Sequence, residues 1–327
     1  MIFRALLAEK TDGAYRADFR DLDDDDLHGE VLVDVAYSSL NYKDGLAVTG
    51  RGKIVRKFPI VLGIDLAGTV VESSSPAYTP GERVVACGQG LGETEWGGYA
   101  QRQRVRAEAL VPLPDALSFQ QAMAIGTAGF TAMLCALALE QLDVRPSERE
   151  FVVTGAAGGV GSIAVMLLAK RGYKVAASTG RPELEDYLRG LGATSMVPRD
   201  ELSKKSAPLE SERWGGGVDT VGGQTLATLF AQTAYGGAIA CCGMAGGGEL
   251  QTFVWPLILR NVSLLGVSSV QTPLAQRRTA WAALAEEIDR EKLASLSRVE
   301  PLSRIRDVAE ELLGGRVHGR IVIDVNR

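Results

Sequence analysis

Histidine and cysteine are scarce in this chain, which limits the metal chemistry it can support. Only two histidines, His28 and His318, occur among 327 residues. Four cysteines are present, and none of them has the C-x-x-C spacing of a zinc ribbon or belongs to a disulfide framework. With so few soft ligands, we predict no metal ion. The cysteines are Cys87, Cys135, Cys241 and Cys242.

The chain also lacks an excess of positive charge, a signal peptide and a long apolar run. Its formal net charge is −5, so nucleic acid is not an expected partner. The first residues, MIFRALLAEK, become charged too early for a signal peptide. The longest apolar run, Ala128–Leu139, is too short to span a membrane and is typical of a buried helix. We therefore expect a soluble cytoplasmic protein with reduced thiols and no membrane partner.

The chain divides into two regions that differ in their predicted secondary structure. Short strand patterns such as Glu30–Ser39, Asp65–Ser73 and Gly81–Cys87 predict a mainly β domain, with the acidic run Asp21–Asp26 as a solvated loop. From Phe151 onward, short apolar runs alternate with helix-length segments. This order predicts an α/β fold, a doubly wound parallel sheet of the Rossmann type. The six runs are FVVTG, KVAAST, TSMVP, GVDTVG, GAIACCG and VSLLGV.

The C-terminal segment is too small to form a third domain. It contains two amphipathic helical patterns, Leu274–Ile288 and Ser303–Leu313, and a last strand pattern, Arg320–Val325. We expect this tail to fold back onto the first domain. The predicted boundaries are 1–124 with 269–327 for the catalytic domain and 125–268 for the nucleotide-binding domain.

The stretch VVTGAAGGVGSIAV, Val152–Val165, predicts a strand, a phosphate-binding turn and a helix. Ala157 replaces the second glycine of G-x-G-x-x-G, but the physical requirements are met. Gly155 permits the sharp turn, and Gly161 permits close packing of helix and strand. The helix N-terminus then points its positive end at the anion. The residues expected to contact the pyrophosphate of a dinucleotide are Ala157, Gly158, Gly159 and Val160.

The end of the second strand of this domain decides between NAD(H) and NADP(H). An NAD site places a carboxylate there to accept hydrogen bonds from the ribose 2′-hydroxyl. This chain has no carboxylate before Glu183, and Arg199 follows the next strand. Hydroxyl groups and guanidinium groups favour a 2′-phosphate, so the predicted cofactor is NADPH. The residues at the strand end are Ser178, Thr179, Gly180 and Arg181.

Five motifs together resemble the medium-chain dehydrogenase/reductase superfamily, specifically its zinc-free quinone-oxidoreductase branch. They are SLNYKD, PIVLGIDLAGTV, GTAGFTA, GAAGGVG and HGRIVIDV, and the resemblance covers essentially the whole length. It implies that the β domain is GroES-like and is completed by the tail. Zinc-dependent relatives carry a cysteine ligand near Asn41–Asp44 and a histidine where this chain has Ile64. Those departures agree with the absence of a metal site.

Within that branch the chain is most similar to bacterial acryloyl-CoA reductases, through SSLNYKD, VTGRGKIVR, IGTAGFTAMLC and ILRNVSLLGV. This resemblance implies NADPH-dependent reduction of an acryloyl thioester by a homodimer. A dense positive cluster in an acidic chain supports a CoA substrate independently, because CoA carries phosphates. The residues expected to hold them are Arg51, Lys53, Arg56 and Lys57.

The candidate catalytic residues are Asn41, Tyr42, Lys43 and Asp65. Asn41 and Tyr42 are expected to position and hydrogen-bond the reacting groups near the nicotinamide. Tyr42, beside the positive charge of Lys43, is a candidate donor of the proton to the α-carbon, as are solvent and the ribose hydroxyl. Asp65 is expected to orient Lys43 or the cofactor, or to be a turn residue.

Four further residues complete the predicted cofactor site. The resemblance implies that Thr127 hydrogen-bonds near the nicotinamide or the diphosphate and that Asn261 lies beside the far end of the cofactor. Gly243, at the end of the fifth strand, is expected to pass close to the cofactor. Arg320 is expected to meet the diphosphate once the tail folds back.

Two other functions stay open at this point. One is a general NADPH-dependent quinone or enone oxidoreductase, which would not need the basic cluster. The other is a non-enzymatic NADPH-binding protein, against which the reaction-side group Asn41–Lys43 argues.

Overall fold

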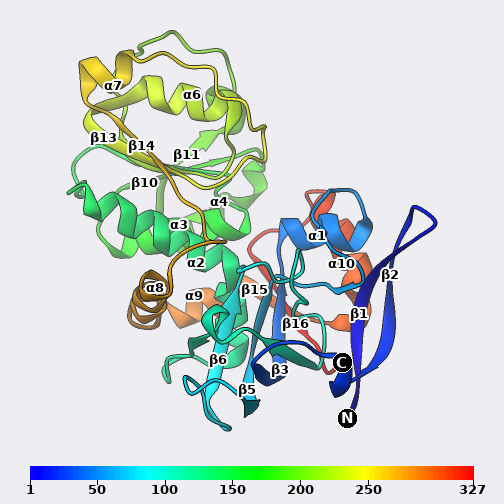
Figure 1. Cartoon of the computed structure of the whole chain (residues 1–327). Helices are drawn as coiled ribbons and strands as arrows, with labels where there is room; N and C mark the ends of the chain where they lie inside the picture. The colour runs from blue at the N-terminus through cyan, green and yellow to red at the C-terminus, as the bar shows by residue number, and fades with distance from the viewer. The chain divides into compact units, whose positions relative to one another are not determined.

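The computed structural model describes residues 1–327, and these residues form two compact units (Figure 1). Unit 1 comprises Met1–Phe130, Ser269–Glu286 and Leu293–Arg327. Unit 2 comprises Thr131–Ser268 and Glu287–Lys292. The functional domain boundaries given above stay a prediction.

Unit 1 is built on a seven-stranded sheet with the order β15-β16-β3-β5-β6-β8, with β7 also paired to β3. A second sheet has the order β2-β1-β4. Buried aliphatic side chains from both sheets form its core. The strands are β1 (Ile2–Thr11), β2 (Ala14–Asp23), β3 (Val31–Leu40), β4 (Ile60–Val61), β5 (Asp65–Ser73), β6 (Arg83–Cys87), β7 (Arg102–Val105), β8 (Val111–Pro112), β15 (Ser297–Pro301) and β16 (Arg320–Asp324).

The C-terminal tail completes the large sheet of unit 1, as predicted. Strand β16 pairs antiparallel with β3, so that Ile321 lies opposite Leu40. The predicted helical patterns are also present, but the polar strand β15 and the short helix α9 have no clear hydrophobic period and were missed. The helices along this part of the chain are α1 (Tyr42–Thr49), α8 (Leu274–Glu287), α9 (Arg290–Ser295) and α10 (Ile305–Leu313), with short 3₁₀ turns at Asp24–Asp26, Ala107–Ala109 and Leu302–Arg304.

Unit 2 is a six-stranded, all-parallel sheet with the order β11-β10-β9-β12-β13-β14. Numbered within the unit, this is 3-2-1-4-5-6, the order of the dinucleotide-binding fold, which confirms the predicted fold class. The order reverses between β9 and β12, where such folds bind their ligand. The strands are β9 (Phe151–Thr154), β10 (Val175–Thr179), β11 (Ala193–Pro198), β12 (Trp214–Asp219), β13 (Thr233–Cys241) and β14 (Ser263–Gly266).

Helices cover both faces of this sheet, with α3 and α4 on one side and α6 and α7 on the other (Figure 1). One predicted strand was misplaced, because GVDTVG begins inside β12 and runs past its end. The strand starts earlier, at Trp214, because glycines at the positions that follow let it pass close to its neighbours: a Cβ on Gly216 would collide with the carbonyl oxygen of Ala238. The helices are α3 (Gly159–Lys170), α4 (Glu185–Leu191), α5 (Arg199–Leu202), α6 (Gly223–Gln232) and α7 (Trp255–Arg260), with a 3₁₀ turn at Pro182–Leu184.

Helix α2 (Phe119–Gln141) contains the apolar run Ala128–Leu139, which is helical and largely buried as expected. The prediction that the apolar segment is too short to cross a membrane was wrong, because the helix extends back to Phe119. By length and composition alone it is long and apolar enough to cross one, and 78% of its most apolar window is buried within the protein. The helix is interrupted at Gly126, where φ is 49° and ψ is −160°.

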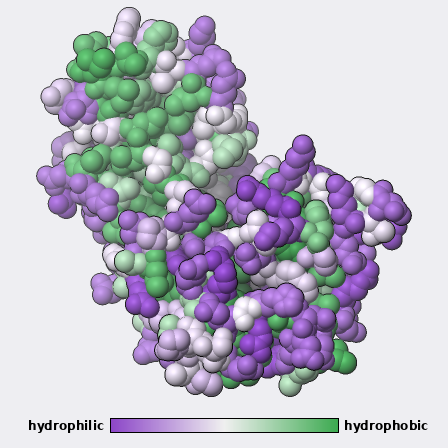
Figure 2. All heavy atoms as spheres, in the orientation of Figure 1, coloured by the Kyte–Doolittle hydropathy of each residue, from purple (hydrophilic) through white to green (hydrophobic).

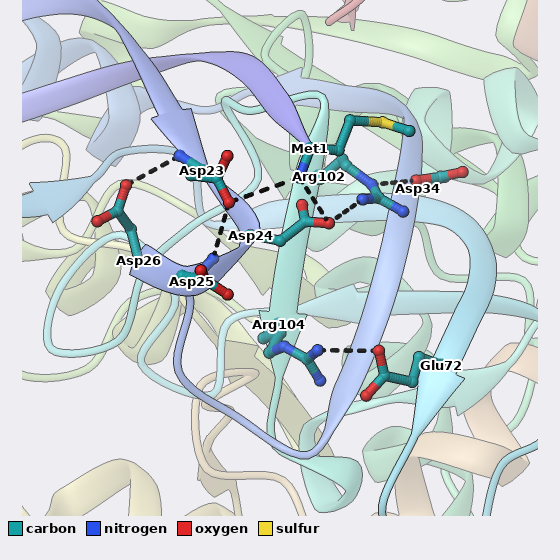
Figure 3. Close-up of polar contacts among 9 residues, drawn as sticks. All are labelled: Met1, Asp23, Asp24, Asp25, Asp26, Asp34, Glu72, Arg102 and Arg104. Carbon is teal, nitrogen blue, oxygen red and sulfur yellow. Dashed lines mark hydrogen bonds and ion pairs between the residues drawn. The ribbon is translucent and has the colours of Figure 1, made fainter.

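The acidic run Asp21–Asp26 is solvated at Asp21, Asp25 and Asp26, as predicted, but it is not an irregular loop. It ends β2 and forms a 3₁₀ turn with a capping box between Asp23 and Asp26. Arg102 is nearly buried and pairs with Asp24 from this turn and with Asp34 of β3 (Figure 3). A partly buried guanidinium needs acidic partners. Asp24 is such a partner for Arg102, but it lies 78 residues away, so no local sequence pattern indicates the contact.

Candidate functional site

The glycine-rich turn of unit 2 has the geometry of a phosphate site. Gly155 follows β9 with a positive φ of 58°. A Cβ on Gly161 would collide with the carbonyl oxygen of Gly155, so the turn and the helix can pack this closely only with glycine. Gly158 is the N-cap of α3, and no side chain caps the helix there. The first N–H groups of α3 are therefore available to an anion, which fits a dinucleotide pyrophosphate.

The buried carboxylate of Asp219 fixes the strand end that precedes this turn, and the sequence analysis did not identify it. Asp219, at the end of β12, accepts hydrogen bonds from the Thr154 hydroxyl at 2.6 Å and from the Gly222 N–H at 2.7 Å. The Thr220 hydroxyl donates to the Thr154 carbonyl at 2.9 Å. Burial raises the pKa of Asp219. Asp219 could have been identified from the sequence, because it is a carboxylate at the end of a buried strand beside the point where the strand order reverses.

The end of β10 borders a cavity of about 510 Å³, lined by Thr179, Gly180 and Arg199 among others. A Cβ on Gly180 would collide with the Arg199 guanidinium, so this cation lies directly over the strand end. Arg181 also lies beside the glycine-rich turn, with its Nη2 3.4 Å from the Ala157 carbonyl. Arg199 lines the cavity and Arg181 lies beside the turn, and these two cations suit a phosphate ester, although the carboxylates of Glu185 and Asp200 also line the cavity.

Gly243 and Asn261 each have a local structural reason for their identity. A Cβ on Gly243 would collide with the carbonyl oxygen of Thr220, so this residue lies against the β12 loop. Asn261 ends α7 with a left-handed φ of 49°, a conformation that asparagine tolerates. Their contacts with a cofactor stay predictions.

In unit 1, the candidate residues that follow β3 are organised by a capping box. Asn41 is the N-cap of α1, and Asp44 at the third helical position accepts from the Asn41 N–H at 2.9 Å. The other oxygen of Asp44 accepts from the Ile64 N–H at 2.9 Å. Burial, together with the nearby charge of Asp65, raises the pKa of Asp44 to about 7.

Asp65 is the centre of this cluster. Its Oδ2 accepts from the Ser39 hydroxyl at 2.5 Å and from Nδ2 of Asn41 at 2.9 Å. Thr127 donates to the same carboxylate twice, from its backbone N–H at 2.9 Å and from its hydroxyl at 2.5 Å. Asp65 therefore holds Asn41 and Thr127. The expectation that it orients Lys43 was wrong.

Lys43 contacts Glu93 instead, at 2.7 Å. Glu93 lies 50 residues away in a loop of unit 1, and sequence reasoning missed it. Because this carboxylate compensates the ammonium group, Lys43 does not supply the uncompensated charge expected beside Tyr42. Tyr42 itself is 58% exposed, at the start of α1.

Arg320 does not have the predicted position at a diphosphate. Its side chain is buried inside unit 1, where Nε donates to the Ala124 carbonyl at 2.9 Å and Nη1 donates to Oδ1 of Asn41 at 3.1 Å. Nη2 donates to the Ser39 hydroxyl at 3.0 Å. Burial lowers the pKa of Arg320, and the nearby Asp65 opposes this shift. The side chain of Arg320 reaches Ser39 and Asn41 because β16 pairs with β3.

The predicted basic cluster lies on the surface after α1, and all four of its cations are exposed. Arg51 is paired with Glu310 of α10 at 2.8 Å. Lys53, Arg56 and Lys57 have no such acidic partner.

These residues do not fit a zinc ion. Nowhere in the chain do three or more His, Cys, Asp or Glu side chains gather in a way that suits a metal. Cys87 lies opposite Asp65 on β6, but no third ligand gathers beside these two side chains. The guanidinium of Arg320 already provides positive charge beside the carboxylates.

Comparison with known proteins agrees with both halves of this description. Residues 27–115 match the family model "Alcohol dehydrogenase GroES-like domain". Residues 159–289 match the model "Zinc-binding dehydrogenase", although the residues present do not fit zinc.

Three relatives are similar over nearly the whole chain. The acrylyl-CoA reductase AcuI of Ruegeria pomeroyi is 50% identical, covering 99% of this chain and 100% of its own. The yhdH oxidoreductase of Salmonella enterica, solved in complex with NADP, has a TM-score of 0.96 at 49% identity, covering 98% of this chain and 99% of its own. The putative quinone oxidoreductase YhfP of Bacillus subtilis is 42% identical over 98% of both chains, and its structure with NAD bound covers 99% of both chains with a TM-score of 0.95. The chain belongs to the medium-chain dehydrogenase/reductase superfamily, in the group that includes AcuI and YhfP.

Proposed function

We propose that this protein is a zinc-independent, NADPH-dependent oxidoreductase that reduces the C=C bond of acryloyl-CoA to give propionyl-CoA. The observation that carries the proposal is a phosphate turn with Arg181 beside it and Arg199 over the end of β10, in a chain 50% identical to AcuI over 99% of its length. The polar cluster of unit 1 supplies hydrogen-bonding groups where zinc-dependent relatives use a metal.

Unit 2 holds the nucleotide. The uncapped N–H groups that begin α3 bind the pyrophosphate, and Gly159 and Val160 provide them. The Gly158 N–H already donates to the Gly155 carbonyl at 2.9 Å. Arg181 and Arg199, with the hydroxyl group of Thr179, bind the 2′-phosphate. Bound NADPH supplies the hydride for the β-carbon of the thioester.

The side chains of unit 1 stabilise the charge that develops on the thioester. Reduction at the β-carbon leaves an enolate oxygen, and one well-placed hydrogen-bond donor contributes about 3–4 kcal/mol to such a transition state. We assign this role to Tyr42, which is exposed at the start of α1. Asn41 and Thr127 donate to Asp65, and they orient the reactants through their oxygen atoms. The α-carbon takes its proton from Tyr42 or from water.

The basic cluster accounts for the CoA portion. Three exposed cations without acidic partners, Lys53, Arg56 and Lys57, provide a positive surface a few residues after Tyr42. The phosphates of CoA match this charge, whereas a simple quinone has none. General quinone or enone reduction is the second candidate function, because the relative YhfP has the name of a putative quinone oxidoreductase.

We also propose a cytoplasmic homodimer. Strand β14 is an edge of the six-stranded sheet, and unpaired edges promote association. Beside it, apolar side chains on and before α7 are 44–73% exposed, and they gather at the top left of Figure 2. A second copy that pairs through β14 would cover them. The four cysteines are free thiols, in keeping with the cytoplasm. The exposed residues are Phe253, Val254, Trp255, Leu257, Ile258 and Leu259.

The test measures NADPH oxidation with acryloyl-CoA and with a small quinone, with and without a chelator. Turnover of acryloyl-CoA that exceeds quinone turnover and is insensitive to chelator supports the proposal. The variant Lys53→Gln/Arg56→Gln/Lys57→Gln is expected to raise KM for acryloyl-CoA about tenfold or more, since each charged hydrogen bond contributes ~1.5–3 kcal/mol. Its quinone kinetics should not change.

Arg51→Gln is the matched control, because Glu310 already compensates this cation, and it should change KM for acryloyl-CoA much less. Turnover of the quinone alone would favour the second candidate function. Equal effects of the triple variant on both substrates would contradict the assignment of CoA to the basic cluster.

A further inference from the structure

Three chain segments that are distant in sequence meet at one carboxylate in unit 1, namely the start of β5, the junction of β3 and α1, and the interruption in α2. Asp65 begins β5 and is completely buried. It contacts the end of β3 through Ser39, the start of α1 through Asn41, and the interruption in α2 through Thr127. Its own carbonyl accepts a hydrogen bond from the Ser38 hydroxyl at 2.6 Å, which also fixes its backbone to β3.

Every group that is hydrogen-bonded to the carboxylate of Asp65 acts as a donor. Oδ2 receives three hydrogen bonds and Oδ1 receives one. The Ser39 oxygen accepts from Nη2 of Arg320 at 3.0 Å and from Nδ2 of Asn41 at 3.2 Å, so its own proton points at Asp65. Four donors suit an ionised carboxylate, which accepts through both oxygens.

Arg320 provides the opposite charge. Its guanidinium is buried beside the cluster and contacts Ser39 and Asn41, two of the groups that donate to Asp65. A buried carboxylate without such a partner would cost several kcal/mol. Gly126 leaves room for the pair, since a Cβ there would lie 2.7 Å from Nη2 of Arg320 and 2.8 Å from Oδ2 of Asp65.

The same carboxylate determines where the second part of α2 begins. Gly126 breaks the helix with its positive φ, and the next N–H, that of Thr127, donates to Asp65. A carboxylate at a helix N-terminus is favoured by the helix dipole. The direction of the Thr127 hydroxyl is fixed as well, because it donates to Oδ1 at 2.5 Å.

We propose that Asp65 is the positioning residue of the reaction site, which fixes Asn41 and Thr127 relative to each other, with Arg320 as its buried counter-charge. This inference rests on the proposed function, in which Asn41 and Thr127 orient the reactants. Asp65 acts through them, in place of the link to Lys43 or to the cofactor that its sequence position suggested. Misplacement of such groups by about 1 Å costs ~100-fold in rate.

The test compares Asp65→Asn with Asp24→Asn in the full-length protein. Asp24 also compensates the charge of a buried arginine of unit 1, Arg102, but lies outside the reaction site, so it matches the loss of a negative charge beside a buried arginine. For each variant we would measure the thermal midpoint, the Kd for NADPH by fluorescence, and kcat on acryloyl-CoA or a small quinone, whichever the wild type reduces faster.

We expect both variants to lose thermal stability, and only Asp65→Asn to lose kcat, by about 100-fold. The Kd for NADPH should stay within about threefold, because the phosphate contacts of unit 2 are untouched. Thr127→Val should lower kcat in the same way and Thr127→Ser should not, since serine keeps the donor to Oδ1. The double variant Asp65→Asn/Thr127→Val should be at most about threefold slower than Asp65→Asn, because both changes remove one shared interaction.

If Asp65→Asn does not fold, Ser39→Ala replaces it, because this change removes one donor to Asp65 and leaves both charges in place. It should lower kcat about tenfold with NADPH affinity unchanged. Wild-type kcat in a folded Asp65→Asn or Ser39→Ala protein would overturn the inference, as would additive effects of Asp65→Asn and Thr127→Val. A wild-type protein that binds NADPH but reduces neither substrate would instead overturn the proposed function, and this inference with it.

Discussion

Replacement of Asp44 by asparagine should remove a pH dependence from the stability of this protein. Burial and the nearby charge of Asp65 raise the pKa of Asp44 to about 7, from an ordinary value of 3.8. The folded state therefore binds the proton of Asp44 more tightly than the unfolded state does. Protonation stabilises the fold fully below pH 4, and this stabilisation is lost as the pH rises through 7.

The magnitude follows from the two pKa values. Each unit of difference corresponds to ~1.4 kcal/mol, so the free energy of unfolding should fall by about 3 kcal/mol between pH 5 and pH 8 because of this group. Asparagine does not titrate, and Asp44→Asn should lack this part of the slope. Loss of one acceptor for the Asn41 N–H adds a cost of ~1–3 kcal/mol that does not vary with pH.

Denaturant unfolding, followed by tryptophan fluorescence at four pH values, measures this effect. The quantity of interest is the difference between wild type and Asp44→Asn at each pH, in which the contributions of all other groups cancel. Asp115→Asn, at an exposed carboxylate of the same unit, is the control and should show no pH-dependent difference. Identical slopes for wild type and Asp44→Asn would refute the reasoning and would mean that folding does not raise the pKa of Asp44.

Two further predictions concern the nucleotide site and the subunit contact. Arg199→Ser should raise KM for NADPH at least tenfold and leave KM for NADH unchanged, because a charged hydrogen bond to the 2′-phosphate contributes ~1.5–3 kcal/mol. Steady-state kinetics with both nucleotides measures the two KM values. Equal changes in both would contradict the role assigned to Arg199. Ile258→Asp, at a side chain 73% exposed on α7, should convert the proposed dimer to a monomer. Light scattering measures the mass, Tyr235→Asp is a control outside this patch, and an unchanged mass in Ile258→Asp would argue against association through this face.

Local patterns in the sequence predicted the parts of the fold that local physics determines. The alternation of apolar strands and helices after Phe151 predicted the parallel sheet, and the turn that begins at Gly155 indicated its phosphate site. The tail strand was identified by its apolar pattern and folds back onto the first domain as expected, where it pairs with β3. Strand β15 was missed because its sequence, SRVEP, has no hydrophobic alternation.

Long-range contacts of charged residues were the features that the sequence did not indicate. Lys43 meets Glu93 at a distance of 50 residues, and Arg320 contacts Asn41 at a distance of 279. Each charge has several possible partners in sequence, and only the packing of the strands selects one. The candidate residues Asn41 and Asp65 are hydrogen-bonded to each other, and their catalytic role stays a prediction. The partners of Lys43 and Arg320 were not predicted.

The central claim is that this protein transfers a hydride from NADPH to the β-carbon of acryloyl-CoA. The most direct measurement is mass spectrometry of the product formed with NADPH that carries deuterium at the transferred position of C4, in ordinary water, and then with unlabelled NADPH in heavy water. The account predicts propionyl-CoA with one deuterium at C3 in the first case and one at C2 in the second. Absence of propionyl-CoA, or a product without deuterium at C3 from the labelled cofactor, would contradict it.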